Sequence, residues 1–352
     1  MPTPTPYGGT HLELHPGPFS LPLPPTRLRL VAASSAAELS SLHASGSALL
    51  LHGEIAAEQL TPRGYPFYEN PAHAEILDAI SSAQPVAVIA ATGKNPGTTA
   101  ALSPFPLVED GTFPLPSAYL AEEDLAPLLE AVRSGDEVDI AIDSDRFTAT
   151  GEQAVGLLGT SNAAQRVIVC AHVDTKPDTP GALDNATGVA VVLAAAELLA
   201  SDPPHGLSIE FLPFNGEDHY AAPGEMAYLA AHPPGDDIAL VINIDGAGLR
   251  GGASAISTYE LSPEMESAVT TLLESHPDVA RGPSWFASDH AIFAMQGIPS
   301  VAVTSAELET VVMESVAHTP ADIPDLVDAE VLAQTAHFIA ELVRAIARTH
   351  AA

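Results

Sequence analysis

The stretch Arg166-Val-Ile-Val-Cys-Ala-His-Val-Asp174 decides how this chain folds. Its apolar part, residues 166–170, predicts a strand buried in a parallel sheet. His172 and Asp174 follow at the carboxyl end of that strand, which is where ligands gather in open α/β sheets. Imidazole and carboxylate are ligands that zinc takes in proteins. We therefore expect a metal site here, with Asp184, twelve residues after the histidine, as a further ligand.

Strand-like and helix-like segments alternate after about residue 147, and this alternation is typical of a largely parallel sheet. Strands are expected at 166–171, 208–214, 239–245 and 299–304. Helices are expected after Thr187, from Ser262 and from near Asp328. The predicted fold class is α/β, with a mostly parallel mixed sheet flanked by helices and a smaller α/β domain before it.

The first part of the chain has a different pattern. Residues 1–24 form a Pro-rich arm in which the alternating segment 11–14 predicts an edge strand. Residues 25–145 are expected to form the smaller domain, and 146–352 the larger one. In the smaller domain the apolar runs predict strands at 48–52 and 86–90 and helices at 70–81 and 125–132.

The composition excludes several classes of partner. A formal charge of -33 with 12 basic residues argues against nucleic acid and against an anionic membrane. The single cysteine, Cys170, lies within the apolar run and allows no disulfide inside the chain. We see no secretory signal and no apolar run of the ~20 residues that a membrane helix needs. The sequence therefore predicts a cytoplasmic protein without a membrane partner.

Three further acidic or histidine clusters stand at or beyond predicted strand ends: Glu217-Asp218, Asp245 and His318. A pair of metal ions ~3.5–4 Å apart needs a bridging carboxylate together with terminal histidine and carboxylate ligands. Asp184 is the expected bridge, because a tight loop precedes it and a helix begins behind it. His172 and His318 would be the terminal histidines, with Asp218 and Asp245 as the carboxylates.

The remaining polar residues near these clusters have supporting roles in this interpretation. Asp174 is expected to orient the His172 imidazole through its second nitrogen, and Glu217 to act as general base. Asp322 either holds the second nitrogen of His318 or caps the next turn. Lys176 is assigned to a solvent-exposed loop.

Taken together, these segments resemble the co-catalytic zinc exopeptidases, the family of aminopeptidase Y, bacterial leucyl aminopeptidases and glutamate carboxypeptidase II. The segments are His172-Val-Asp174-Thr, Gly181-Ala-Leu-Asp184-Asn185-Ala-Thr-Gly188, Asn215-Gly-Glu217-Asp218, Asn243-Ile-Asp245, Ser288-Asp-His290 and His318-Thr-Pro-Ala-Asp322. The resemblance covers about 147–352 and implies two zinc ions per chain. It implies the ligands His172, Asp184, Asp218, Asp245 and His318, the base Glu217, and a substrate pocket lined by Ser288, Asp289 and His290.

The resemblance extends to the smaller domain, because 25–145 is similar to the protease-associated domain that many family members carry. That similarity includes a turn at Phe113-Pro-Leu-Pro-Ser117 before a helix. Three features depart from the family pattern. Asp218 stands where the family usually has Glu, which shortens the reach by about 1.5 Å. Ala317 replaces a tyrosine that stabilises the oxyanion, and the helical segment that usually precedes the associated domain is missing.

The function expected from the sequence is that of a zinc-dependent exopeptidase, more specifically an aminopeptidase. Its partner would be a peptide substrate with a free N-terminus, because acidic side chains gather near the motifs and clustered basic ones do not. Two alternatives stay open: a glutaminyl-cyclase-like acyltransferase with a single zinc, and a catalytically silent binding or assembly protein. The missing helical segment leaves an edge that a second copy could cover, which would make a homo-oligomer.

Overall fold

A computed structural model describes residues 11–63, 65, 70–95, 101–159, 163–219 and 222–350. The chain forms two compact units. Unit 1 comprises Met1–Thr98 and Leu102–Ala149, and unit 2 comprises Thr99–Ala101 and Thr150–Ala352. The identification of unit 1 as a protease-associated domain stays a prediction.

Unit 1 is built on a mixed six-stranded sheet with the strand order β1-β5-β4-β3-β2-β6. The strands are β1 (His15–Pro16), β2 (Leu23–Ala33), β3 (Ala48–Leu51), β4 (Ala87–Thr92), β5 (Ser117–Ala121) and β6 (Glu137–Ile142). The helices are α1 (Ala36–Ser40), α2 (Pro71–Ala83) and α3 (Leu125–Ser134), with short 3₁₀ turns η1 (Gly53–Ala56) and η2 (Glu122–Asp124).

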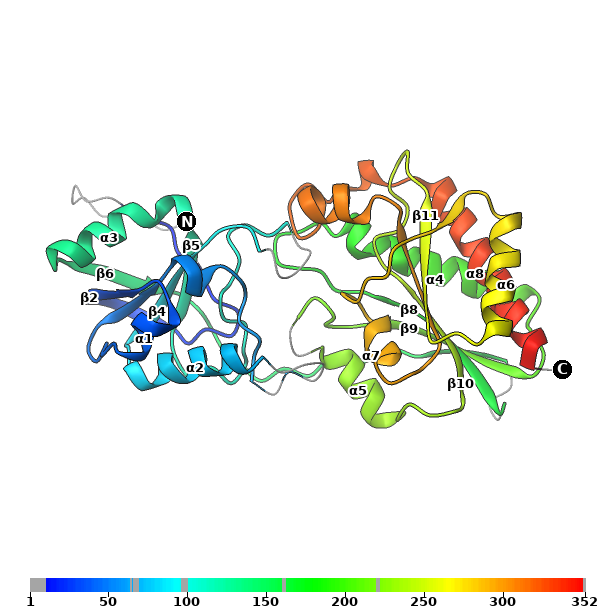
Figure 1. The fold of residues 1–352 in the computed structure, drawn as a ribbon, viewed down its shortest axis with the longest axis horizontal. Coiled ribbons are helices and arrows are strands. Elements are labelled where there is room, and N and C mark those ends of the chain that lie inside the picture. Colours follow the sequence, from blue (N-terminus) through cyan, green and yellow to red (C-terminus); the bar gives the residue numbers. More distant parts are fainter. Residues whose placement is uncertain are drawn as a thin grey trace. The chain divides into compact units, whose positions relative to one another are not determined.

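Side chains of the central strand β3 alternate between two hydrophobic cores, one on each face of this sheet. Leu49 and Leu51 pack in a core with Leu77 of α2. Leu50 packs in the opposite core with Leu128 of α3. Figure 1 accordingly shows α1 and α2 on one face of the sheet and α3 on the other. A fully apolar strand is therefore required, because both of its faces are covered.

Two expectations for unit 1 are wrong in detail. The segment 11–14 is not a strand; the pairing with β5 is made by His15–Pro16. Leu12 and Leu14 instead pack against the hydrophobic core, which explains their alternation. The turn ending at Ser117 does not lead directly into a helix, because β5 comes between them.

Unit 2 is built on a seven-stranded sheet with the order β12-β11-β13-β10-β8-β9-β7. The strands are β7 (Gly156–Gly159), β8 (Gln165–His172), β9 (Leu207–Phe214), β10 (Ile238–Ile244), β11 (Ser254–Tyr259), β12 (Val279–Arg281) and β13 (Ser300–Ser305). The four expected strands are β8, β9, β10 and β13, and they lie next to one another and run parallel. The antiparallel neighbours β7 and β11 were not predicted.

Helices cover both faces of this sheet (Figure 1). They are η3 (Ala182–Ala186), α4 (Thr187–Ser201), α5 (Pro223–Ala231), α6 (Pro263–Ser275), α7 (His290–Ala294), η4 (Leu308–Val316), η5 (Pro324–Leu326) and α8 (Ala329–His350). The main core joins the sheet to α4, α6 and α8. On the other face Phe214 contacts Tyr228 of α5 and Phe293 of α7.

The central helix α4 corrects one expectation from the sequence. Together with the turn before it, it forms a segment, Ala182–Ser201, long and apolar enough to cross a membrane by length and composition. The expectation that no apolar run reaches this length is therefore wrong. More than half of the segment is buried, and α4 packs against β8 and α8. Burial between a sheet and a helix accounts for its apolar composition.

Two leucines of α4 give a matched test of this packing. Leu199 is fully buried, whereas Leu193 is 66% exposed. We expect Leu199→Ala to lower the free energy of unfolding of unit 2 by about 2–5 kcal/mol, because it leaves a cavity. Leu193→Ala should change it by no more than about 0.5 kcal/mol. Denaturant unfolding followed by the fluorescence of Trp285, the only tryptophan, measures both; equal losses would contradict this packing.

Candidate metal centre

The centre lies at the carboxyl ends of the parallel strands of unit 2. His172 is the last residue of β8, and Asp245 directly follows β10. Glu217 and Asp218 follow the end of β9, and His318 follows η4, the helix after β13. Because these four strands are adjacent and parallel, residues far apart in the sequence meet at one edge of the sheet.

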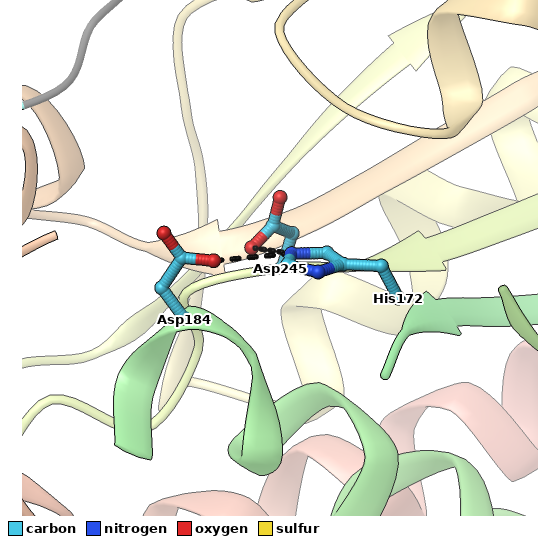
Figure 2. A group of neighbouring side chains, drawn as sticks. All are labelled: His172, Asp184 and Asp245. Carbon is cyan, nitrogen blue, oxygen red and sulfur yellow. Dashed lines mark ion pairs between the residues drawn. The ribbon is translucent and has the colours of Figure 1, made fainter. Parts of the chain in front are cut away.

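The first group of potential metal ligands is His172, Asp184 and Asp245. The Nε2 atom of His172 lies 3.1 Å from Oδ1 of Asp184 and 3.5 Å from Oδ1 of Asp245. Figure 2 shows both carboxylates approaching the same ring nitrogen, Asp184 from the turn before α4 and Asp245 from the end of β10.

The second group is Asp184, Asp218 and His318. The Nε2 atom of His318 lies 3.1 Å from Oδ2 of Asp184 and 2.8 Å from Oδ1 of Asp218. Asp184 therefore belongs to both groups, and it contributes a different oxygen to each. A carboxylate that bridges two metal ions has this arrangement.

Buried atoms without hydrogen-bond partners indicate that these groups fit a metal. His172 is completely buried, yet its Nε2 makes no hydrogen bond to any residue that the structure describes. Asp218 is 5% exposed, and its Oδ2 also has no hydrogen-bond partner within the described part of the chain. Buried polar atoms are normally satisfied, and the ligand types present, histidine and carboxylate, are those of zinc. The residues of both groups therefore fit zinc as the metal.

The electrostatics of the centre favour a cation. Burial alone would lower the pKa of His172, but the charges of Asp245 and Glu217 raise it well above its usual value. Burial likewise opposes protonation of His318, but Asp184 and Asp218 raise its pKa to about 10. Burial would raise the pKa of Asp184, yet its contacts with the two histidines lower it. The same negative field that holds protons on the histidines would stabilise divalent ions in their place.

The loop around Asp184 is held by Asp322. The carboxylate of Asp322 accepts hydrogen bonds from the backbone amides of Leu183 (2.7 Å) and Asp184 (3.0 Å). Asp322 is completely buried. Both interpretations of Asp322 from the sequence are therefore wrong. Its carboxylate does not bond to the second nitrogen of His318, which has no hydrogen-bond partner among the described residues, and it accepts from Leu183 and Asp184 instead of capping the next turn.

On the helical side of Asp184, Asn185 and Gly188 complete the turn. Asn185 donates from Nδ2 to the carbonyl of Ile244 (2.8 Å), at the end of β10, and accepts from the amide of Gly188 (2.9 Å). A Cβ atom at Gly188 would lie 2.5 Å from the carbonyl oxygen of Ile244. Only glycine allows this close approach of α4 to β10, so Gly188 sets the position of the turn.

Asp174 orients His172 in a way that differs from the expectation. The Nδ1 atom of His172 hydrogen-bonds to the backbone carbonyl of Asp174 at 3.0 Å, whereas the carboxylate of Asp174 is 3.9 Å away. The carboxylate accepts instead from the amides of Gly216 (2.7 Å) and Glu217 (3.2 Å). Asp174 thus directs the free Nε2 of His172 toward Asp184 and also holds the segment that carries Glu217.

Glu217 is placed beside the first group without belonging to it. Its Oε2 lies 3.9 Å from Nε2 of His172, and its side chain is 19% exposed. Burial, together with the charges of Asp218 and Asp245, raises the pKa of Glu217 well above its usual value, against an opposing effect of His172. A carboxyl group in such surroundings holds a proton readily, as a general base must after it has taken one.

The segment Ser288-Asp289-His290 contacts the centre through Ser288, and all three residues are at least nine-tenths buried. Ser288 hydrogen-bonds to the carboxylate of Asp245 and accepts from Asn243 (2.8 Å). His290 pairs with the carbonyl of Trp285 (2.8 Å), and burial lowers its pKa to about 4. Burial and the charge of Glu225 raise the pKa of Asp289 well above its usual value. Ser288 therefore helps to hold the Asp245 carboxylate in place. A direct contact of these three residues with substrate stays a prediction.

Two residues of the centre were not recognised in the sequence. Glu225, which is 1% exposed, shares a hydrogen bond with Asp289, but a lone glutamate near a helix start carries no signal of this. Lys176, assigned to a solvent-exposed loop, is half-buried and donates from Nζ to the carbonyl of Asp218. The sequence did offer one indication of this contact: Lys176 stands two residues after Asp174, as Asp174 does after His172.

Solved structures with a similar fold include two bacterial aminopeptidases. The chain superposes on a zinc aminopeptidase from Bacillus subtilis with a TM-score of 0.67 at 22% identity, over 98% of this chain and 80% of that one. An aminopeptidase from Aneurinibacillus sp. strain AM-1 gives a TM-score of 0.67 at 19% identity, over 96% of this chain and 78% of that one. At these identities the likeness establishes the fold.

Curated relatives match a shorter region. The chain is 30% identical over 106 residues to a "Putative endoplasmic reticulum metallopeptidase 1-A" of Caenorhabditis elegans, and 30% identical over 114 residues to a "Vacuolar membrane protease" of Clavispora lusitaniae. These regions are 30% and 32% of this chain but only 12% and 11% of the relatives, respectively. The names of the relatives do not support the cytoplasmic location expected from the sequence.

One family profile spans more than half of the chain. Residues 154–343 match Peptidase family M28, and this region contains every strand of unit 2 and all the residues of both metal-ligand groups. The chain belongs to peptidase family M28.

Proposed function

We propose that this chain is a zinc-dependent aminopeptidase that uses two zinc ions to release N-terminal amino acids from peptides. The observation that carries the proposal is the position of Asp184, whose two oxygens each belong to a separate group of histidine and carboxylate ligands. The family and the fold of the solved aminopeptidases support the same reaction class.

His172, Asp184 and Asp245 would hold one ion, and Asp184, Asp218 and His318 the other. Zinc bound there would polarise the scissile carbonyl and lower the pKa of the attacking water. Asp218 is short for a residue that must reach a metal, but its Oδ1 already lies 2.8 Å from His318 Nε2. The aspartate therefore supports a complete second site.

Glu217 would act as the general base. It would take a proton from the attacking water at its carboxylate and return that proton to the leaving amine. Its carboxylate lies beside the first group and remains partly open to solvent. Asp174 would keep it there, since the Asp174 carboxylate holds the Glu217 amide.

The charges around the centre favour a substrate with a free amino group. The cations nearest to the motifs are engaged by other groups of the protein. Arg250 donates to the carbonyls of Asp325 and Val327, Arg281 pairs with Glu266, and Lys176 donates to the carbonyl of Asp218. An aminopeptidase needs acidic groups near the reacting bond, whereas a carboxypeptidase needs a cation for the substrate carboxylate. The partly exposed carboxylates of Glu217 and Asp245 supply the former.

Removing the general base tests the reaction. We expect Glu217→Gln to lower kcat/KM for an unblocked peptide by ~10²–10⁴-fold while the zinc content stays that of the wild type. Glu264→Gln, on the outer helix α6, is the matched control and should leave the rate unchanged. Release of amino acids from a peptide panel, with N-acetylated peptides as blanks, measures the effect. A wild-type protein that shows no zinc-dependent and Glu217-dependent release would refute the aminopeptidase proposal.

The number of bound ions tests the bridge. Asp184→Asn weakens both groups, so we expect zinc content to fall from near two per chain to well below one. Asp245 belongs only to the first group, so Asp245→Asn should leave about one ion, the number left by one intact group. Elemental analysis after dialysis against a fixed zinc concentration gives both values. One ion in the wild type would instead favour the single-zinc acyltransferase.

The hydrogen bonds of Asp322 give a test outside the ligand set. Asp322→Asn keeps one acceptor but places an amide donor against a backbone N–H, so the Asp184 loop loses part of its support. We expect a ~10–100-fold loss of zinc affinity, as for other residues that orient metal ligands. Asp325→Asn, an exposed aspartate on the same loop, should show no loss. Calorimetric titration with Zn²⁺ compares the two variants, and equal affinities would show that the Asp322 contacts do not matter.

A further inference from the structure

We propose that Lys176 is a positioning residue that fixes the metal ligand Asp218 through its backbone carbonyl. The inference rests on the proposed two-zinc function of the same centre. The lysine would thus have a structural role at the metal centre. This role concerns only the second group of ligands, Asp184, Asp218 and His318.

The first argument is the spacing of residues on the loop after β8. His172, Asp174 and Lys176 follow one another at intervals of two, and the side chains of Asp174 and Lys176 both reach the segment after β9. The first would bind a metal, and the second holds the amides of Gly216 and Glu217. The third donates from Nζ to the carbonyl of Asp218.

The second argument is that these contacts hold three consecutive residues of the neighbouring loop. Residues 216, 217 and 218 are each bonded through their backbone to a side chain from the β8 loop. Gly216 has a φ of 107°, a conformation open mainly to glycine. The segment follows β9 and does not continue its ladder with β8 beyond Phe214. The side chains of Asp174 and Lys176 therefore supply the hydrogen bonds that the sheet no longer provides.

The third argument concerns the ligand itself. An aspartate side chain has only two rotatable bonds, so its carboxylate cannot compensate for a shift of the backbone that carries it. Asp218 is 5% exposed and lies 2.8 Å from His318 through Oδ1. A bond to its own carbonyl therefore controls where the carboxylate meets the second metal. The first group contains no residue of this segment.

Charge and position predict opposite effects for Lys176, and this difference makes the inference testable. As a positive charge beside several carboxylates, the lysine would repel a divalent cation, so its removal would strengthen metal binding. As a tether for Asp218, its removal would weaken binding at the second site only. Tighter zinc binding in the variant would indicate that charge repulsion dominates, and weaker binding would indicate that Lys176 positions Asp218.

The experiment is a calorimetric titration of the metal-free full chain with Zn²⁺. For Lys176→Met we expect one of the two binding events to weaken by ~10–100-fold, the range for residues that orient ligands, and the other to stay within about twofold of the wild type. Lys176→Arg, which keeps a charged donor, should restore binding. Lys94→Met, which removes the only other lysine in the sequence, is the matched control. The fluorescence of Trp285 during thermal unfolding checks that the apo variants fold alike.

A double-mutant cycle with Asp218→Asn makes the assignment specific. If Lys176 acts through Asp218, adding Lys176→Met to Asp218→Asn should weaken zinc binding no further. Lys176→Leu, which also removes the donor, replaces the Met variant if the latter does not fold.

Unchanged or tighter binding in Lys176→Met overturns the inference while leaving the two-zinc function intact, and so does equal weakening of both events. A wild-type chain that binds fewer than two ions overturns the proposed function and the inference together, and that result appears before any variant is made.

Discussion

The metal centre of unit 2 depends on one interaction, in which the buried carboxylate of Asp184 pairs with His172 and His318. Asp184 has one oxygen 3.1 Å from His172 and the other 3.1 Å from His318. A carboxylate buried in this way is stable only with positive charge on both sides. The two histidines come from segments 146 residues apart, so the carboxylate also determines how those segments must meet.

Much of the surrounding structure keeps this carboxylate and its partners in place through backbone groups. The Asp322 carboxylate accepts hydrogen bonds from the backbone amides of Leu183 and Asp184. Asn185 hydrogen-bonds to the carbonyl of Ile244 at the end of β10. Asp174 and Lys176 do the same for the loop after β9. Because these side chains bond to backbone amides and carbonyls, they do not occupy the candidate ligand atoms. For this reason the buried Nε2 of His172 and Oδ2 of Asp218 remain available to a metal.

The sequence predicted the parts of this arrangement that have a local signature. The strands β8 and β10 are mostly apolar, because both faces of the sheet are covered by helices, and a candidate metal ligand stands at the end of β8 and directly after β10. The strand β7 was missed because it is short and exposed, with Leu157 72% exposed. The role of Asp322 was missed for a different reason. Its partners are backbone amides 138 and 139 residues away, and a backbone amide has no identity that a sequence can show.

By itself, the sequence determined which residues are candidate ligands, their order, and the location of His172, Asp218 and Asp245 at or after strand ends. These follow from residue chemistry and from the apolar periodicity that places a strand in a covered sheet. Only the tertiary structure decided which oxygen of Asp184 faces which histidine, that Asp174 orients His172 through its carbonyl, and that Lys176 contacts Asp218. The physical reason is that these contacts form only where two loops are placed relative to each other to within about 0.5 Å. Such distances are set by the packing of whole strands and helices, and no single segment contains them.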